Sequence, residues 1–191
     1  MKIWLPILLF MAGCGSACAY PAPDYEAARK ATVRIEMLAG VCSGTAIGHH
    51  TLLSAEHCTS EGVTGWVVNG RTVVITKVVS DGADHVLLTT DVYFKDIARM
   101  GSKPKQGDSV FGFGNPAGVP GMLQVGYVSG WVGEVMMLDR PGDWYGCSGA
   151  AVFDRYGRVV GVVNAVYPFP IIPWRMTAIF PLKFTDEQLA S

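Results

Sequence analysis

The sequence predicts an all-β fold. Short β-branched runs recur between turn signals, and stretches with helical periodicity are few. The 191 residues include 23 glycines and 11 prolines, as expected for a chain with many turns. Hydrophobic residues make up 50% of the chain and charged residues 16%, which is enough for one good core or two small ones. The spacing of the runs favours a sandwich or a barrel.

The expected strands share β-branched or alternating apolar residues. In chain order they are Thr32–Met37, Thr45–Ile47, Val67–Asn69, Thr72–Ser80, Val86–Thr89, Ser109–Phe113, Leu123–Val128, Glu134–Leu138, Ala150–Phe153 and Arg158–Val163. Asn69-Gly70 is a hairpin signal between two of these runs. The polar stretch Asp91–Asp108 predicts a linker between two barrels, and the tail Phe184–Leu189 predicts one or two helical turns. We expect no further binding domain after residue 182.

Residues 1–19 predict a signal peptide. Lys2 precedes a short apolar run, Ile3–Met11, which is too short for a permanent membrane anchor. The sequence offers two alternative cleavage sites for this signal peptide. One is an ordinary small-residue site that ends before Tyr20, and the other resembles a bacterial lipoprotein box that would leave Cys14 lipidated as a membrane tether. Either site predicts export, as a secreted, periplasmic or membrane-anchored lipoprotein.

Net charge and residue spacing limit the classes of partner that the sequence predicts. The net charge is −1 and the pI about 6.4, so nothing favours a nucleic-acid partner. No Cys-x-x-Cys or His-x-x-x-His spacing occurs, so we expect no metal site. We also expect no organic cofactor.

The run 146–150, Gly-Cys-Ser-Gly-Ala, predicts a serine on a tight turn. The glycines on either side of Ser148 allow a sharp backbone turn that directs amide N–H groups to one spot. A serine nucleophile needs a base, and that base needs an orienting acid. We interpret His49, His50 and His85 as structural residues, because the first two lie in a polar stretch and the third faces away from Asp84 on an alternating strand. His57 follows an apolar strand-like run and is the candidate base.

Three blocks in the order His, Asp, Ser resemble the trypsin-like, chymotrypsin-fold serine proteases. They are residues 43–58, which end in Ser-Ala-Glu-His-Cys, residues 81–88, which contain Asp-His-Val-Leu-Leu, and the serine run 146–150. Further segments over residues 110–182 resemble bacterial high-temperature-requirement-type peptidase domains, here without a PDZ domain. The resemblance implies two six-stranded antiparallel Greek-key β-barrels, at residues 25–95 and 105–182, with the active site in the cleft between them and a tail at 183–191.

The resemblance also implies roles for single residues. Ser148 would attack the scissile carbonyl, His57 would carry the proton, and Asp84 would orient the imidazole. The Gly146 and Ser148 amides would form the oxyanion hole. Asp81 is the rival acid, although its place between Ser80 and Gly82 favours a turn. The family pairs cysteines at the positions of Cys42 and Cys58, which implies a disulfide.

Two departures from the family pattern concern activation and specificity. Cys147 stands where zymogen-type members carry an acid, so we expect no activation by insertion of a new N-terminus; its two interpretations are a small buried residue and a competing nucleophile. Asn164, Ala165 and Val166 stand where many members have Ser-Trp-Gly, and Val166 would narrow the primary pocket toward small or medium apolar side chains. The alternative is that Asp143 selects Lys or Arg; the usual pocket acid lies one residue earlier, at Gly142.

The leading hypothesis is therefore an exported serine endopeptidase that acts on polypeptides through an acyl-enzyme. The alternative is a catalytically inactive, protease-like binding protein at the cell surface. No residue of the expected triad is missing, which favours the enzyme.

Overall fold

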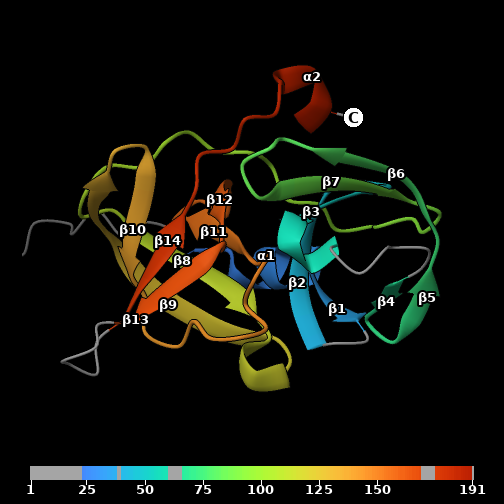
Figure 1. The fold of residues 1–191 in the computed structure, drawn as a ribbon, viewed down its shortest axis with the longest axis horizontal. Helices are drawn as coiled ribbons and strands as arrows, with labels where there is room; N and C mark the ends of the chain where they lie inside the picture. Colours follow the sequence, from blue (N-terminus) through green and yellow to red (C-terminus); the bar gives the residue numbers. More distant parts are fainter. Residues whose placement is uncertain (1–22, 38–39, 60–65, 169–174, 191) are drawn as a thin grey trace, which may run out of the picture.

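Two curled antiparallel sheets lie side by side in the structure, a computed structural model that describes residues 23–37, 40–59, 66–168 and 175–190 (Figure 1). The first sheet comes from the N-terminal half of the chain and the second from the C-terminal half. The predicted signal peptide, with Cys14, lies outside the described residues.

The first sheet has seven strands in the order β5-β4-β1-β2-β3-β7-β6. Its strands are β1 (Thr32–Met37), β2 (Gly40–Gly48), β3 (Thr51–Ala55), β4 (Trp66–Val68), β5 (Arg71–Val73), β6 (Ile75–Ser80) and β7 (His85–Thr90). The two edge strands, β5 and β6, are consecutive in the chain and only Val74 separates them. The sheet therefore curls round until its two edge strands come together at Val74.

The second sheet repeats this arrangement, in the order β12-β11-β8-β9-β10-β14-β13. Its strands are β8 (Ser109–Gly114), β9 (Met122–Val132), β10 (Val135–Asp139), β11 (Ala151–Asp154), β12 (Val159–Val162), β13 (Ala165–Pro168) and β14 (Arg175–Ile179). Here Val163 and Asn164 separate the two edge strands. Both residues line the candidate site described below, so the corner of the second sheet contributes directly to it.

The strand count corrects the sequence-based expectation of six strands in each barrel. The run 72–80 is divided at Val74, whose N–H donates to the Asp91 carboxylate (2.9 Å), so its two parts lie at opposite edges of the sheet. In the second sheet, residues 165–168 form an additional strand that pairs with β14. The predicted all-β fold class and the pair of barrels are confirmed.

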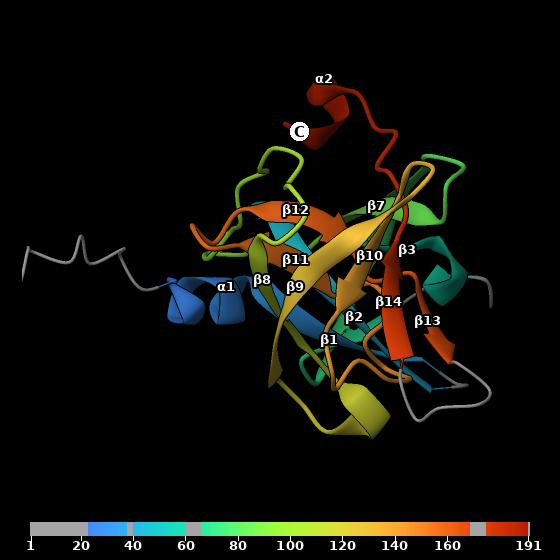
Figure 2. The ribbon, with the colours of Figure 1, turned by 90° about the vertical axis from the view of Figure 1, so that its left-hand side faces the viewer.

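A short helix that the sequence did not reveal, α1 (Tyr25–Ala31), packs where the two sheets meet (Figure 2). The Asp24 side chain caps it by accepting the N–H of Ala27 (3.0 Å). Ala28 and Ala31 are buried, and the Tyr25 ring meets Phe111 edge to face at 4.7 Å. The helix helps to seal the hydrophobic core that both sheets share.

The remaining helices are single turns: η1 (Glu56–Thr59), η2 (Pro116–Gly118) and α2 (Asp186–Leu189). The last of these forms within the expected helical tail, where Thr185 and Gln188 make a capping box. Within the described ranges, no helix is long and apolar enough to cross a membrane.

Three clusters of buried hydrophobic residues stabilise the molecule. One fills the first barrel around Ile35 and Leu52, another fills the second around Leu138 and Val152, and the largest joins the two sheets. The joining core includes Leu53 from β3 and Phe153 from β11. Continuous apolar packing of this kind fixes the two barrels relative to each other.

The structure contains the expected disulfide between Cys42 on β2 and Cys58 on η1. Because Cys58 directly follows His57, the bridge ties the turn that carries the histidine to the sheet.

Replacing Cys42 and Cys58 together with alanine should lower the free energy of unfolding by about 3 kcal/mol, since the bridge restricts the unfolded chain over a loop of this length. Urea denaturation followed by tryptophan fluorescence measures the change. A reducing agent should lower the stability of the parent protein to that of the variant and leave the variant unchanged. Equal stability of the oxidised parent and the variant would contradict this account.

Candidate active site

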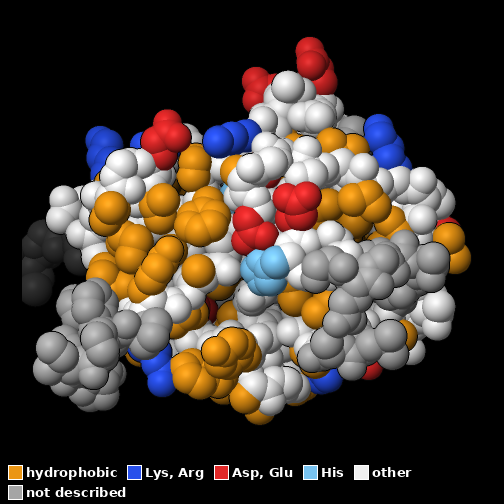
Figure 3. Space-filling view, viewed as in Figure 1, with side chains coloured by type: hydrophobic (Ala, Val, Ile, Leu, Met, Phe, Trp, Pro, Cys, Tyr) orange, Lys and Arg blue, Asp and Glu red, His pale blue; other side chains and the backbone are white. Residues whose placement is uncertain are grey.

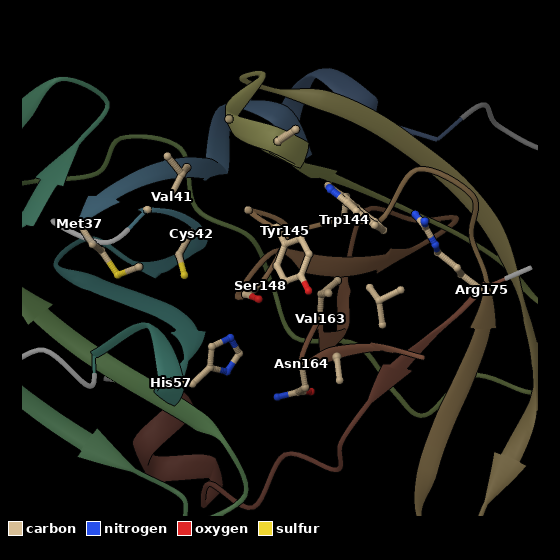
Figure 4. A pocket seen from close by; sticks show the side chains of 16 residues that line it. Met37, Val41, Cys42, His57, Trp144, Tyr145, Ser148, Val163, Asn164 and Arg175 are labelled. Atoms are coloured by element: carbon tan, nitrogen blue, oxygen red, sulfur yellow. The ribbon is translucent and has the colours of Figure 1, made fainter. Parts of the chain in front are cut away.

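A cavity of about 720 Å³ opens between the two sheets. Met37, Val41, Cys42 and His57 line it on the side of the first sheet, as Figure 4 shows. Trp144, Tyr145, Ser148, residues 163–166 and Arg175 line the other side. At the surface, a histidine and two acidic side chains lie near the middle of this face, between areas of hydrophobic side chains (Figure 3).

The imidazole of His57 is held by the carboxylate of Asp84. Nδ1 lies 2.9 Å from Oδ2 and 3.0 Å from Oδ1, and the His57 backbone N–H donates to Oδ1 (3.0 Å). These contacts place the proton on Nδ1, because a carboxylate oxygen can only accept from the ring. Nε2 is thereby left as the nitrogen that can take up a proton.

Asp84 occupies an uncommon backbone conformation that serves this contact. Its φ is +65°, in the left-handed region where aspartate is among the better tolerated residues. Its carbonyl accepts the Glu56 N–H at 3.1 Å, which joins the turn before β7 to the turn that carries His57. The local backbone thus brings the acid and the base together.

Asn164, at the corner between β12 and β13, holds Asp84 from the opposite barrel. Its Nδ2 donates to the Asp84 carbonyl (3.0 Å) and carboxylate (3.2 Å), and its Oδ1 accepts the Phe180 N–H (2.9 Å). A backbone carbonyl only accepts and a backbone N–H only donates, so these partners fix the orientation of the amide. Asn164 is therefore a positioning residue for Asp84.

A second, buried histidine–aspartate pair lies behind Asn164. Nδ1 of His85 is 2.8 Å from Asp81 Oδ2, and its Nε2 is 3.3 Å from Asn164 Oδ1. Both ring nitrogens therefore face acceptor oxygens. His85 is fully buried and makes the structural contacts expected of it, while Asp81 pairs with His85.

Burial raises the pKa of the Asp81 carboxyl, but hydrogen bonds outweigh it and hold the pKa below the ordinary value. The donors are the Lys183 and Ala83 amides and the His85 ring. Asp81 thus stays ionised within this network, and the geometry favours Asp84 over Asp81 as the partner of His57.

The turn that carries Ser148 is clamped by Ser43 of β2. The Ser43 N–H donates to the Ser148 carbonyl (2.8 Å), and the Ser43 hydroxyl donates to the Gly146 carbonyl (2.8 Å). Asn115 supports that hydroxyl from the second barrel (2.8 Å), and Ser54 donates to the Ser43 carbonyl (2.8 Å). The turn that carries Ser148 in one barrel is therefore bonded directly to the sheet that leads to His57.

Glycine is required on both sides of Ser148. The φ angles of Gly146 and Gly149 are +98° and +83°, which L side chains rarely adopt. A Cβ at Gly146 would approach the Asn115 carbonyl, and one at Gly149 would approach the Ser43 carbonyl, both within 2.3 Å. The close approach of the backbones that forms the clamp depends on these two residues.

The Tyr145 carbonyl accepts the Ala117 N–H at 2.7 Å, which turns the Gly146 N–H of the same trans peptide the opposite way. Among the described residues, neither the Gly146 nor the Ser148 amide donates a hydrogen bond. The described residues likewise include no hydrogen bond between the Ser148 hydroxyl and the His57 ring, although both residues line the cavity. Such catalytic bonds often tighten only when a substrate binds.

Cys147 is fully buried beneath the turn, and burial raises the pKa of its thiol to about 11. A thiol with so high a pKa is protonated at neutral pH and is a poor nucleophile. The structure therefore favours the small buried residue over the competing nucleophile.

The five residues expected to bind substrate fall into two groups. Asn164, Ala165 and Val166 line the main cavity, whereas Gly142 and Asp143 line a neighbouring cavity of about 240 Å³. The Asp143 carboxylate is buried and paired with Arg140 at 2.7 and 2.8 Å, and it accepts the Thr177 hydroxyl at 2.6 Å. An acid neutralised in this way does not offer a free charge to a basic substrate side chain.

Sequence reasoning missed the residues that act through tertiary contact. Ser43 and Asn115 carry no local signal, because their partners lie far away in the chain. Arg175 and Trp144 were also missed, because nothing in the local sequence around them indicates the cavity that they line. Within the described residues, no group of three potential metal ligands occurs.

Comparison with known proteins agrees with this geometry. The family model described as a trypsin-like peptidase domain matches residues 42–162. The structure of Rv3671c from M. tuberculosis H37Rv in an inactive form is similar, with a TM-score of 0.70 at 16% identity over 89% of this chain and 88% of that one. A serine endoprotease from Yersinia pestis has a TM-score of 0.68 at 20% identity over 82% of this chain; the match spans 62% of that protein. A search of curated protein sequences finds no match.

These likenesses show the fold, which is the chymotrypsin-like pair of β-barrels.

Asn164→Ala should lower kcat about tenfold and change KM little, because it removes a hydrogen bond to the charged Asp84. Steady-state kinetics on a peptide substrate measures both constants. Asn164→Gln retains the amide but places it one methylene further from the backbone, away from the position that bonds Asp84, so it should not restore kcat. A variant with normal kcat would contradict the positioning role.

Cys147 should resist alkylation by iodoacetamide at pH 8 in the folded protein and react rapidly in urea, because its thiol is buried and protonated. Mass spectrometry of the peptide that contains Cys147 measures the extent of labelling. Rapid labelling under native conditions would show an accessible thiolate and contradict this description.

Proposed function

Because the chain belongs to the trypsin-like peptidase family and is a serine endopeptidase of that family, we propose that His57, Asp84 and Ser148 are its catalytic triad. The observation that carries the proposal is the Asp84–His57 pair, 2.9 Å apart, on the wall of the cavity that Ser148 enters from the opposite sheet. Two barrels therefore contribute the base and the nucleophile to one cleft.

The first half of the proposed reaction forms an acyl-enzyme. Ser148 Oγ attacks the carbonyl carbon of the scissile peptide bond while its proton passes to Nε2 of His57. The negative charge that develops on the substrate oxygen is stabilised by the Gly146 and Ser148 amides, each worth roughly 3–4 kcal/mol in a known case. The C–N bond then breaks, and His57 delivers its proton to the leaving amine.

The second half releases the product. A water molecule gives a proton to His57 and attacks the acyl carbon. The bond from that carbon to Ser148 Oγ then breaks, His57 returns the proton to Oγ, and the product leaves as a free carboxylic acid. Asp84 accepts the Nδ1 proton of His57 and stabilises the imidazolium in both steps, while Asn164 donates to its carboxylate. The proposed chemistry uses only side chains and backbone amides of the chain.

Export belongs to the same proposal. The apolar run after Lys2 supports a signal peptide, and the Cys42–Cys58 bridge is consistent with an oxidising compartment. Both ways of processing the leader fit, including a membrane tether through a lipidated Cys14.

We further propose that this enzyme needs no newly formed N-terminus for activity. The position that carries the activating acid in zymogen-type relatives is the buried Cys147. The nucleophile loop is held by other contacts, namely the Ser43 clamp on Gly146 and the pairing of Asp143 with Arg140.

A fluorophosphonate probe should label the protein at Ser148, because an activated serine attacks phosphorus as it attacks a carbonyl. Labelling of Ser148→Ala should be abolished, while Ser109→Ala, which changes an exposed serine at the start of β8, should label like the parent. Gel fluorescence and peptide mapping give the readout. Equal labelling of Ser148→Ala, or no labelling of the parent, would overturn the triad, and the latter would favour the inactive binding protein.

A further inference from the structure

We propose that Arg175 makes this protease selective for substrates with an acidic side chain, aspartate or glutamate, on the residue whose carbonyl Ser148 attacks. The inference rests on the proposed function and names its substrate class. It starts from an arginine in the wall of the candidate cleft that the catalytic proposal does not use.

Arg175 is the first residue of β14 and lines both cavities, the one that contains Ser148 and the smaller one beside it. Trp144 and Val166 are also shared, so these three residues form the boundary between the cavities. Ser148, Val163 and Arg175 are among the side chains that line the main cavity in Figure 4. A side chain next to the scissile carbonyl can follow the wall of this cavity to the arginine.

The guanidinium of Arg175 is held in place by stacking. Its central carbon lies 3.7 Å from the centroid of the Trp144 ring. A guanidinium that stacks face-on upon an aromatic ring keeps its N–H groups at its edge, where they match the two oxygens of a carboxylate. The stacking also reduces the rotamer freedom that binding would otherwise cost.

Among the residues that the structure describes, no acid is paired with Arg175. The described residues include no ion pair or hydrogen bond to its side chain, and residues 169–174, which precede it, contain no charged residue in the sequence. Asp143 is already neutralised by Arg140 and Thr177. Asp139 also lines the smaller cavity, but it is exposed and follows the buried Leu138 on an alternating strand, so its side chain points away from the barrel interior.

The guanidinium of Arg175, exposed at the start of β14 and joined to no acid of the described residues, thus presents a positive charge to a largely apolar cavity. A carboxylate can form charge-assisted hydrogen bonds there, whereas an amide of the same shape forms weaker ones and an amine is repelled. Val166 still limits the size of the side chain, so its expected steric role is retained. The charge of Arg175 then decides among side chains that fit.

The test uses the mature protein and peptide substrates that differ only at the residue supplying the scissile carbonyl: Glu, Gln, Ala or Lys. We expect kcat/KM for Glu to exceed that for Gln by about ten- to a hundredfold, the range of a hydrogen bond to a charged group. Arg175→Glu should abolish this preference and raise cleavage after Lys. Arg175→Met, which keeps length without charge, should bring Glu and Gln to similar rates.

Arg155→Glu is the matched control. Arg155 also lies over an aromatic ring, that of Tyr156 at 4.8 Å, but it lines neither cavity, so the same change of charge should leave the Glu preference intact.

Parent protein that cleaves after Gln as fast as after Glu would overturn the inference, as would an Arg175→Glu variant that keeps the preference. Fluorophosphonate labelling of Ser148 in each protein separates the two proposals. Normal labelling without a Glu preference refutes the role of Arg175 alone, whereas absent labelling of the parent refutes the proposed function.

Discussion

The bonding of Ser43 to the nucleophile turn is the constraint on which the rest of the site depends. Its N–H and hydroxyl donate to the Ser148 and Gly146 carbonyls. Gly149 has no Cβ that would clash with the Ser43 carbonyl, and Gly146 has none that would clash with Asn115, which supports the Ser43 hydroxyl. The strand that carries Ser43 pairs with β3, which leads into His57. The position of the serine relative to the histidine is therefore set by buried hydrogen bonds between the barrels, and the shared core around Leu53 and Phe153 keeps those barrels in register.

The same principle holds on the acid side of the cleft. Asn164 of the second barrel binds Asp84 and His85 of the first, and Asp81 in turn accepts the Lys183 amide from the C-terminal segment. Each member of this network satisfies its neighbours, which is the condition under which buried polar groups order a structure. Two buried pairs thus support the proposed catalytic residues. His85–Asp81 lies beside Asp84, and Arg140–Asp143 lies in the loop that leads to Ser148.

Much of this could be predicted from the sequence, since β-branched runs and glycine-rich turns are local signals. The strand at 32–37 was predicted at its observed bounds, and the resemblance of three ordered blocks to a known family pointed to His57 and Ser148, which line one cavity. Helix α1 was missed because its buried face consists of small alanines, and the break at Val74 was missed because a bond to Asp91 decides it. The pairing of Asp143 and the place of Arg175 depend on contacts between distant segments, which no local pattern records.

The most direct test of the account is a crystal structure of the protein treated with a peptidyl diphenyl phosphonate, which traps an activated serine as a tetrahedral adduct. The account predicts a covalent bond from Ser148 Oγ to phosphorus, a phosphonyl oxygen within hydrogen-bond distance of the Gly146 and Ser148 amides, and Asp84 still bound to His57 Nδ1. An adduct on Cys147, an oxygen held by other groups, or no adduct at all would contradict it.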